Sequence, residues 1–115
     1  MTIRQLTKAE EQIMKILWQM GEEIVKDIIF RMTDPKPAYS TVSTVIRVLE
    51  SKGFIDHRVE GYSHIYFPLV KEKDYKHFAL DSIMNGFFQN SYQDLLSFLV
   101  SEKKLEKAEL EELSN

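Results

Sequence analysis

The chain has 115 residues, of which 43% are hydrophobic and 29% are charged, so it is long enough for one domain, or for one small domain with an extension. It contains no cysteine, which excludes disulfides, thiolate zinc sites and cysteine nucleophiles. Its longest apolar runs of three or four residues are far below the roughly 18 needed to span a bilayer. Residues 1–5 lack the apolar core of a signal peptide. We therefore expect a soluble protein of the cytoplasm.

The net charge of −3 is unevenly distributed along the chain. Residues 1–70 contain nine basic and nine acidic side chains, whereas residues 71–115 contain six basic and nine acidic ones. The segment 36–49 has two cations, Lys36 and Arg47, and no acid. The negative net charge is therefore compatible with a phosphate-binding surface on the first part of the chain.

Three segments with helical periodicity occupy the first half. The first lies within residues 7–21, with a capping box at its start and Gly21 as its stop signal. The second extends over about residues 22–32 and the third over about 40–53, each closed by a proline or a glycine. Apolar residues recur at i, i+3, i+4 and i+7 in each, which predicts one buried face per helix. These faces consist of Ile13, Ile16, Leu17 and Met20, of Val25, Ile28, Ile29 and Met32, and of Val42, Val45, Ile46 and Leu49.

The other face of the third helix carries small hydroxyl side chains around one long cation. Its members are Ser40, Ser43, Thr44, Arg47 and Ser51. Serine and threonine are weaker helix formers than glutamate and lysine. Short hydrogen-bonding side chains allow a helix to lie deep in a DNA groove and reach base edges. The alternative, a solvated face on an ordinary three-helix domain, stays open from this pattern alone.

A β-hairpin follows the third helix. Residues 54–60 and 63–69 predict two strands, joined by Gly61-Tyr62 in a type II′ turn. Ile65, Phe67 and Leu69 alternate along the second strand, so we expect that face to be buried. Three short helices followed by a hairpin are the order of a winged helix-turn-helix, a mostly helical α+β fold. We assign it to residues 1–70.

Catalytic and metal chemistry have little support. The hairpin register pairs His57 with Tyr66 and Val59 with His64, so we expect the two histidines not to converge on a metal ion. The sequence has no glycine-rich phosphate loop, nucleophile elbow or zinc-binding helix motif. It therefore predicts neither an enzyme nor a metal or cofactor site.

Residues 71–115 predict a helical dimerisation region. About 45 residues rich in aromatics and leucine cannot form a dry core alone, whereas two copies can. We expect Asn85-Gly86 to interrupt the first helix, a second helix to start near Ser91, and a short charged helix over 102–112. The predicted dimer contacts are Phe78, Ile83, Phe87, Leu95, Phe98 and Leu99.

One segment resembles a known recognition helix. Residues 38–54 contain Thr41-Val42-Ser43-Thr44 followed by Lys52-Gly53-Phe54, and they resemble the penicillinase/methicillin-resistance repressor family (BlaI/MecI/CopY). The likeness continues over residues 6–14 and through the hairpin to 95–100. It implies a dimeric winged-helix repressor on a palindromic operator. It also implies that a membrane sensor metalloprotease cuts the dimerisation region, or provokes the cut, after a β-lactam signal.

Three departures from that family are visible. The family commonly has arginine directly before the leucine that matches Leu49, whereas this chain has Val48 there and Arg47 one position earlier. The family's cut falls in an Asn-Phe pair, whereas the aligned pair here is Ser97-Phe98. The absence of cysteine excludes the sensing mode of the copper-responsive branch.

We therefore predict a DNA-binding repressor without catalytic activity. The residues expected at the major groove are Tyr39, Ser40, Thr41, Ser43, Thr44 and Arg47, with Lys36, Arg58 and Tyr62 on the flanking backbone or minor groove, and with His64 also beside the duplex. One alternative is a ligand-sensing winged-helix regulator with a pocket between the aromatic tail and the DNA-binding domain. Another is a winged helix used only for protein–protein assembly.

Overall fold

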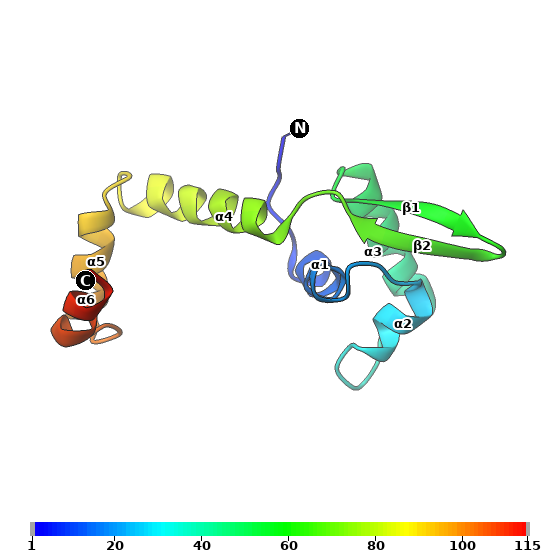
Figure 1. Ribbon diagram of the computed structural model, residues 1–115, viewed down its shortest axis with the longest axis horizontal. Coiled ribbons are helices and arrows are strands. Elements are labelled where there is room, and N and C mark those ends of the chain that lie inside the picture. Colours follow the sequence, from blue (N-terminus) through cyan, green and yellow to red (C-terminus); the bar gives the residue numbers. More distant parts are fainter. Residues whose placement is uncertain (1, 115) are drawn as a thin grey trace. The chain divides into compact units, whose positions relative to one another are not determined.

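The computed structural model describes residues 2–114 and contains six helices and one hairpin in that range (Figure 1). In chain order they are α1 (Lys8–Met20), α2 (Val25–Phe30), α3 (Tyr39–Ser51), β1 (Ile55–Glu60), β2 (Ser63–Pro68), α4 (Glu72–Phe87), α5 (Tyr92–Ser101) and α6 (Lys107–Ser114). Contacts divide the chain into two compact units, Met1–Lys76 and His77–Asn115. Among the described helices, none combines the length and the apolar character that a membrane span requires.

The start of α1 is capped as predicted. The Thr7 hydroxyl accepts from the Glu10 amide at 3.2 Å, and the Glu10 carboxylate accepts from the Thr7 amide at 2.9 Å. Glu10 is only 3% exposed, and both of its oxygens also accept from Lys52 Nζ, at 2.8 and 2.9 Å. Burial acts to raise the pKa of Glu10, but the bonds from Lys52 and Thr7 outweigh it and lower the pKa. This pair joins the start of α1 to the end of α3.

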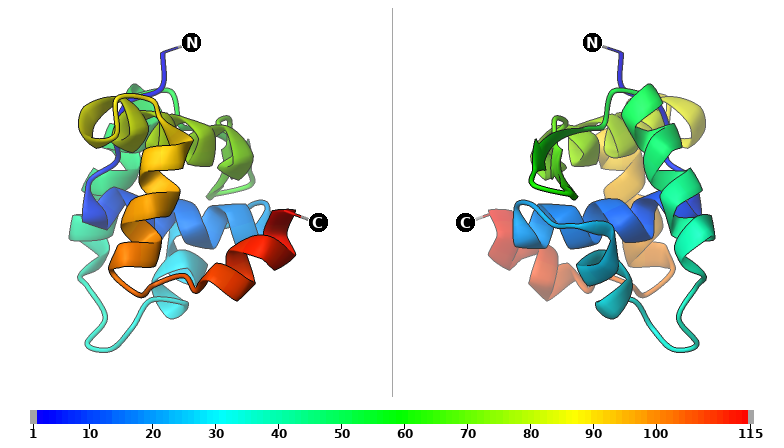
Figure 2. Two further views of the ribbon diagram at one scale, coloured as in Figure 1. Left: turned by 90° about the vertical axis from the view of Figure 1, so that its left-hand side faces the viewer. Right: turned by 90° about the vertical axis from the view of Figure 1, so that its right-hand side faces the viewer.

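The first unit has its core between the three helices and the base of the hairpin. Figure 2 shows α1, α2 and α3 packed on one another. The predicted apolar residues of the three helices, apart from Met20, belong to this core or pack against it. Trp18 Nε1 donates to the carbonyl of Val70 at 2.8 Å. Tyr75 lies against the rings of Trp18 and Phe54, each at 5.9 Å, and its hydroxyl accepts from the Leu6 amide. These contacts explain why the first turn of α4 belongs to the first unit.

The second helix is shorter than predicted. The sequence suggested a start near Glu22, but α2 begins at Val25. Glu23 instead pairs with Tyr66 through two backbone hydrogen bonds of 2.9 and 3.0 Å. A residue that bonds to a strand is extended, so it cannot start the helix.

The hairpin has the predicted register but a different buried face. Glu60 pairs with Ser63 across the two-residue turn, and Gly61 has the positive φ of 61° that its first central position requires. The expectation that Leu69 is buried with Ile65 and Phe67 is wrong. Leu69 is 45% exposed and the other two are half-buried, whereas Tyr66 is only 9% exposed. The bridge to Glu23 turns the Tyr66 side of the strand toward the helices.

The second unit corrects two predicted boundaries. Helix α4 passes through Asn85 and Gly86 without a break, because a single glycine costs a helix only about 1 kcal/mol. The chain turns instead at Gln89 and Asn90, both with left-handed φ, and Ser91 then caps α5. The last helix begins at residue 107 rather than 102.

Candidate nucleic-acid interface

The polar face predicted for the third helix is exposed on α3. Tyr39, Ser40, Thr41, Thr44 and Arg47 are all exposed, and Ser43 is half-buried. The Thr44 hydroxyl donates to the Ser40 carbonyl at 2.9 Å, so its oxygen lone pairs face outward as acceptors. Within residues 2–114, no carboxylate lies within ion-pair distance of Arg47. This surface therefore offers one unneutralised cation surrounded by short hydrogen-bonding groups.

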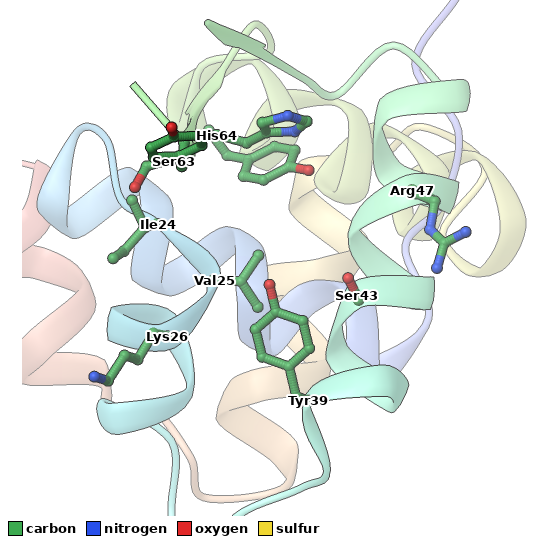
Figure 3. A pocket seen from close by; sticks show the side chains of 10 residues that line it. Ile24, Val25, Lys26, Tyr39, Ser43, Arg47, Ser63 and His64 are labelled. Atoms are coloured by element: carbon green, nitrogen blue, oxygen red, sulfur yellow. The ribbon is translucent and has the colours of Figure 1, made fainter. Parts of the chain in front are cut away.

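A groove of about 460 Å³ separates this face from α2 and β2. It is lined by Ile24, Val25, Lys26, Tyr39, Ser43, Arg47, Tyr62, Ser63, His64 and Tyr66. In Figure 3, Tyr39 and Ser43 lie across from Val25 and Lys26, whereas the Arg47 guanidinium points away from α2. The structure thus brings five residues that were expected beside DNA to one concave surface, namely Tyr39, Ser43, Arg47, Tyr62 and His64.

Lys26 is a further cation of this surface that was not predicted from the sequence. It lines the groove from α2 and is exposed. Its position could have been predicted, because Lys26 directly follows Val25 of the apolar face and a basic side chain there faces solvent.

Arg58 lies on the wing, but it is held by carboxylates of the same chain. Its guanidinium donates to both oxygens of Glu22, at 3.2 and 2.5 Å, and its Nε donates to Glu60 at 3.0 Å. These bonds raise the pKa of Arg58 and lower the pKa of Glu22. Three of its five N–H donors are therefore engaged, and two carboxylates already balance the charge that a phosphate would meet. Tyr62, at the tip of the turn, is fully exposed.

Lys36 is likewise engaged within the chain. Its Nζ donates to the carbonyl oxygens of Phe30 at 3.1 Å and Met32 at 2.5 Å, and lies 3.6 Å from Asp34. These carbonyls belong to the C-terminal end of α2 and the following turn, where a cation is favourable. The structure thus shows Lys36 as a cap for this end of α2.

The two hairpin histidines stack, which the register argument did not predict, but His64 is not in the one group of possible metal ligands found among the described residues. The His57 and His64 rings stack with centroids 4.7 Å apart and planes within 10°. They are diagonal neighbours on one face of the hairpin, and the prediction considered only directly opposed pairs. His57 Nδ1 also lies 2.5 Å from a Glu50 oxygen. One possible metal-ligating atom from each of Glu50, Asp56 and His57 lies within 4.8 Å of the other two. Hydrogen bonds within this group already occupy His57 Nδ1 and one Asp56 oxygen.

Tyr66 adds a neutral phenol to the groove. Burial raises the pKa of Tyr66, and the nearby Glu50 carboxylate raises it further. The hydroxyl therefore stays protonated at neutral pH and is able to donate a hydrogen bond to a ligand in the groove.

The second unit presents apolar side chains to solvent. Of the predicted dimer contacts, Ile83, Phe87 and Phe98 are exposed, while Phe78, Leu95 and Leu99 are half-buried. Phe98 also contacts Phe88, with ring centroids 5.8 Å apart. Ser97 is exposed next to Phe98 within α5, so the predicted cleavage pair lies inside a helix.

Comparisons with known proteins agree with this fold. The chain is 29% identical over 112 residues to the methicillin resistance regulatory protein MecI of Staphylococcus aureus, covering 96% of this chain and 91% of MecI. It is 28% identical over 116 residues to the penicillinase repressor of Bacillus licheniformis, covering 96% and 88%.

Two solved structures resemble the winged-helix part. The DNA-binding domain of the repressor BlaI matches with a TM-score of 0.57 and 28% identity, over 64% of this chain and 92% of that one. The monomeric form of Bacillus licheniformis BlaI in complex with the blaP half-operator matches with a TM-score of 0.54, 28% identity and the same coverage.

These findings confirm the winged-helix fold and the predicted family resemblance. The family model described as penicillinase repressor matches residues 6–115. Its members are transcriptional repressors, which confirms the prediction of a regulator rather than an enzyme. The chain belongs to the penicillinase repressor family.

Proposed function

We propose that this protein is a cytoplasmic DNA-binding transcriptional repressor that reads its operator through the exposed face of α3. The observation that carries the proposal is the unneutralised Arg47 among hydroxyl side chains, on a helix of a winged-helix domain. Arginine forms bidentate bonds to guanine, and serine and threonine bind bases or phosphates. The named relatives, regulators of methicillin resistance and of penicillinase, support a role in antibiotic resistance.

Within this interface, we assign separate tasks to the exposed groups. Arg47 and Ser43 are expected to meet base edges, together with Tyr39, Ser40, Thr41 and Thr44 along the same helix. Tyr62 and Arg58 are expected to touch the phosphate backbone from the wing, and Lys36 to touch it beyond α2. Arg58 and Lys36 already have intramolecular partners, so their net contributions are smaller than that of a free cation.

The protein acts as a homodimer in this proposal, through residues 71–115. Phe87 is 82% exposed, and the exposed Ile83 and Phe98 belong to the same unit. Large apolar side chains exposed in one unit favour contact with another protein surface. A two-fold axis would place two α3 helices in successive major grooves, which fits a palindromic operator.

Release of the operator by proteolysis completes the proposal. A cut between Ser97 and Phe98 would split α5 and remove part of the dimerisation region from each protomer. A membrane sensor metalloprotease is the expected source or trigger of this cut. Mass spectrometry of the protein from β-lactam-treated cells should show a fragment that ends at Ser97. An intact chain under induction, or a different terminus, contradicts this step.

The operator is found by selection from a library of random DNA duplexes. We expect the recovered sequences to contain inverted half-sites about one helical turn apart. Binding to them should weaken steeply with salt, because phosphate contacts release counterions. Failure to enrich any sequence, together with no salt-dependent DNA binding, would favour the assembly-module alternative instead.

A further inference from the structure

A second hollow lies beside α3 and is formed jointly with the N-terminal segment. It has a volume of about 440 Å³ and is lined by Arg4, Thr44, Arg47, Val48, Ser51 and Lys52. Three of these residues are basic, two carry hydroxyls and none is acidic. Its composition therefore suits a negatively charged group.

Two of the three cations are available to such a group. Lys52 is neutralised by Glu10, with Nζ–O distances of 2.8 and 2.9 Å. Arg4 and Arg47 are exposed, and neither has an ion-pair partner in the part of the chain that the structure describes. The guanidinium of Arg47 points away from α2 in Figure 3. The hollow thus carries two positive charges that no carboxylate of residues 2–114 balances.

Arg4 is held in place although it is close to the N-terminus. Ile3 packs against the core of the first unit, and the Leu6 side chain is buried in it. The Leu6 amide also donates to the Tyr75 hydroxyl at 2.9 Å. Because both flanking anchors are fixed, the backbone at Arg4 cannot move far from α3.

The position of the hollow relative to the groove defines its partner. Tyr39, Ser43 and Arg47 line the groove, whereas Thr44, Arg47 and Ser51 line the hollow, so the two flank the exposed face of α3. A helix about 10–12 Å across fills a major groove about 12 Å wide, and a phosphate strand then runs along each side of it. With α3 in the groove, the wing would meet one strand and the hollow would face the other.

We infer that Arg4 is a DNA-backbone contact, and that the hollow between the N-terminal segment and α3 receives a phosphate of the strand opposite the wing. This inference rests on the proposed function, since it takes α3 as the reading helix. Arg4 supplies a charge and two or more N–H donors, and Ser51 supplies a hydroxyl donor beside it. The contact adds affinity for any sequence and does not distinguish bases.

The test compares Arg4→Gln with the full-length wild type on a selected duplex and on a scrambled duplex, over a range of salt. We expect weaker binding to both duplexes by the same factor, and a slope of log K against log salt that is smaller by about 0.9. Arg4→Lys should restore most of the slope because it keeps the charge. Lys15→Gln removes one charge from α1, where Lys15 pairs with Glu11, and should leave the slope unchanged.

The outcomes separate the inference from the proposed function. If the wild type does not distinguish the selected from the scrambled duplex, the proposed function fails. If the wild type does so and Arg4→Gln keeps its slope, the Arg4 contact is overturned. A loss confined to the selected duplex also overturns it, because that result indicates base reading. A thermal unfolding midpoint equal to that of the wild type shows that Arg4→Gln is folded.

Discussion

Replacing Phe87 by alanine is the most direct test of the dimer. Phe87 ends α4 and is 82% exposed in the single chain. Complete burial of a phenylalanine side chain stabilises a structure by about 1.5–3 kcal/mol, so the exposed part contributes about 1.2–2.5 kcal/mol per protomer. A two-fold interface contains the same side chain twice. The loss per dimer is therefore about 2.5–5 kcal/mol, which weakens dimerisation by roughly 60-fold to 4,000-fold.

Sedimentation velocity over a range of protein concentrations measures this change. The wild type should sediment as a dimer at micromolar concentration, and Phe87→Ala should shift toward the monomer. Phe30→Ala is the matched control, because Phe30 is 76% exposed but lies at the end of α2 in the first unit. An unchanged dimer in Phe87→Ala, or an equal loss in Phe30→Ala, would refute the assignment of the interface to residues 71–115.

Three further predictions concern DNA binding and stability. Arg47→Ala should weaken binding to the selected duplex by about 1–3 kcal/mol and relax the preference at one base pair. Fluorescence anisotropy with matched and mismatched duplexes measures both effects. An unchanged base preference would show that Arg47 does not read a base. Glu22→Gln should free Arg58 for a phosphate, which raises the affinity for all duplexes. The slope of log K against log salt should then steepen by about one contact. An unchanged slope in salt titrations would indicate that Arg58 stays bound to Glu60. Glu10→Gln should lower the free energy of unfolding at pH 7 by about 1–3 kcal/mol, since it leaves Lys52 without its carboxylate. Glu10 has a folded-state pKa below its ordinary value of 4.5, so its contribution is present above pH 4.5 and is lost as the pH falls through the folded-state pKa. Urea unfolding of Glu10→Gln and wild type should therefore converge in acid, and a constant difference contradicts the assigned cause.

The sequence by itself determined the elements whose signals are local. The capping box at Thr7 and the stop at Gly21 depend on residues at most four positions apart, and both are as predicted. The buried faces of the first three helices follow from the 3.6-residue period, and the hairpin register follows from a two-residue turn at Gly61. The spacing of residues along the chain also indicated the hydroxyl-rich face of α3, because side chains three or four positions apart share one face of a helix.

Only the tertiary structure decided which distant groups meet. The Glu23–Tyr66 bridge shortened α2 and chose the buried face of β2, although nothing in either segment indicated the other. Glu22 and Arg58 are 36 positions apart, and their ion pair partly neutralises a wing cation that the sequence presents as free. Arg4 lines the hollow beside α3, and the neighbouring Leu6 is fixed by the core and by a bond to Tyr75, 69 positions away. Periodicity reports which face of an element is apolar, but the partner of a charge is set by the packing of whole elements, and that packing is long-range in sequence.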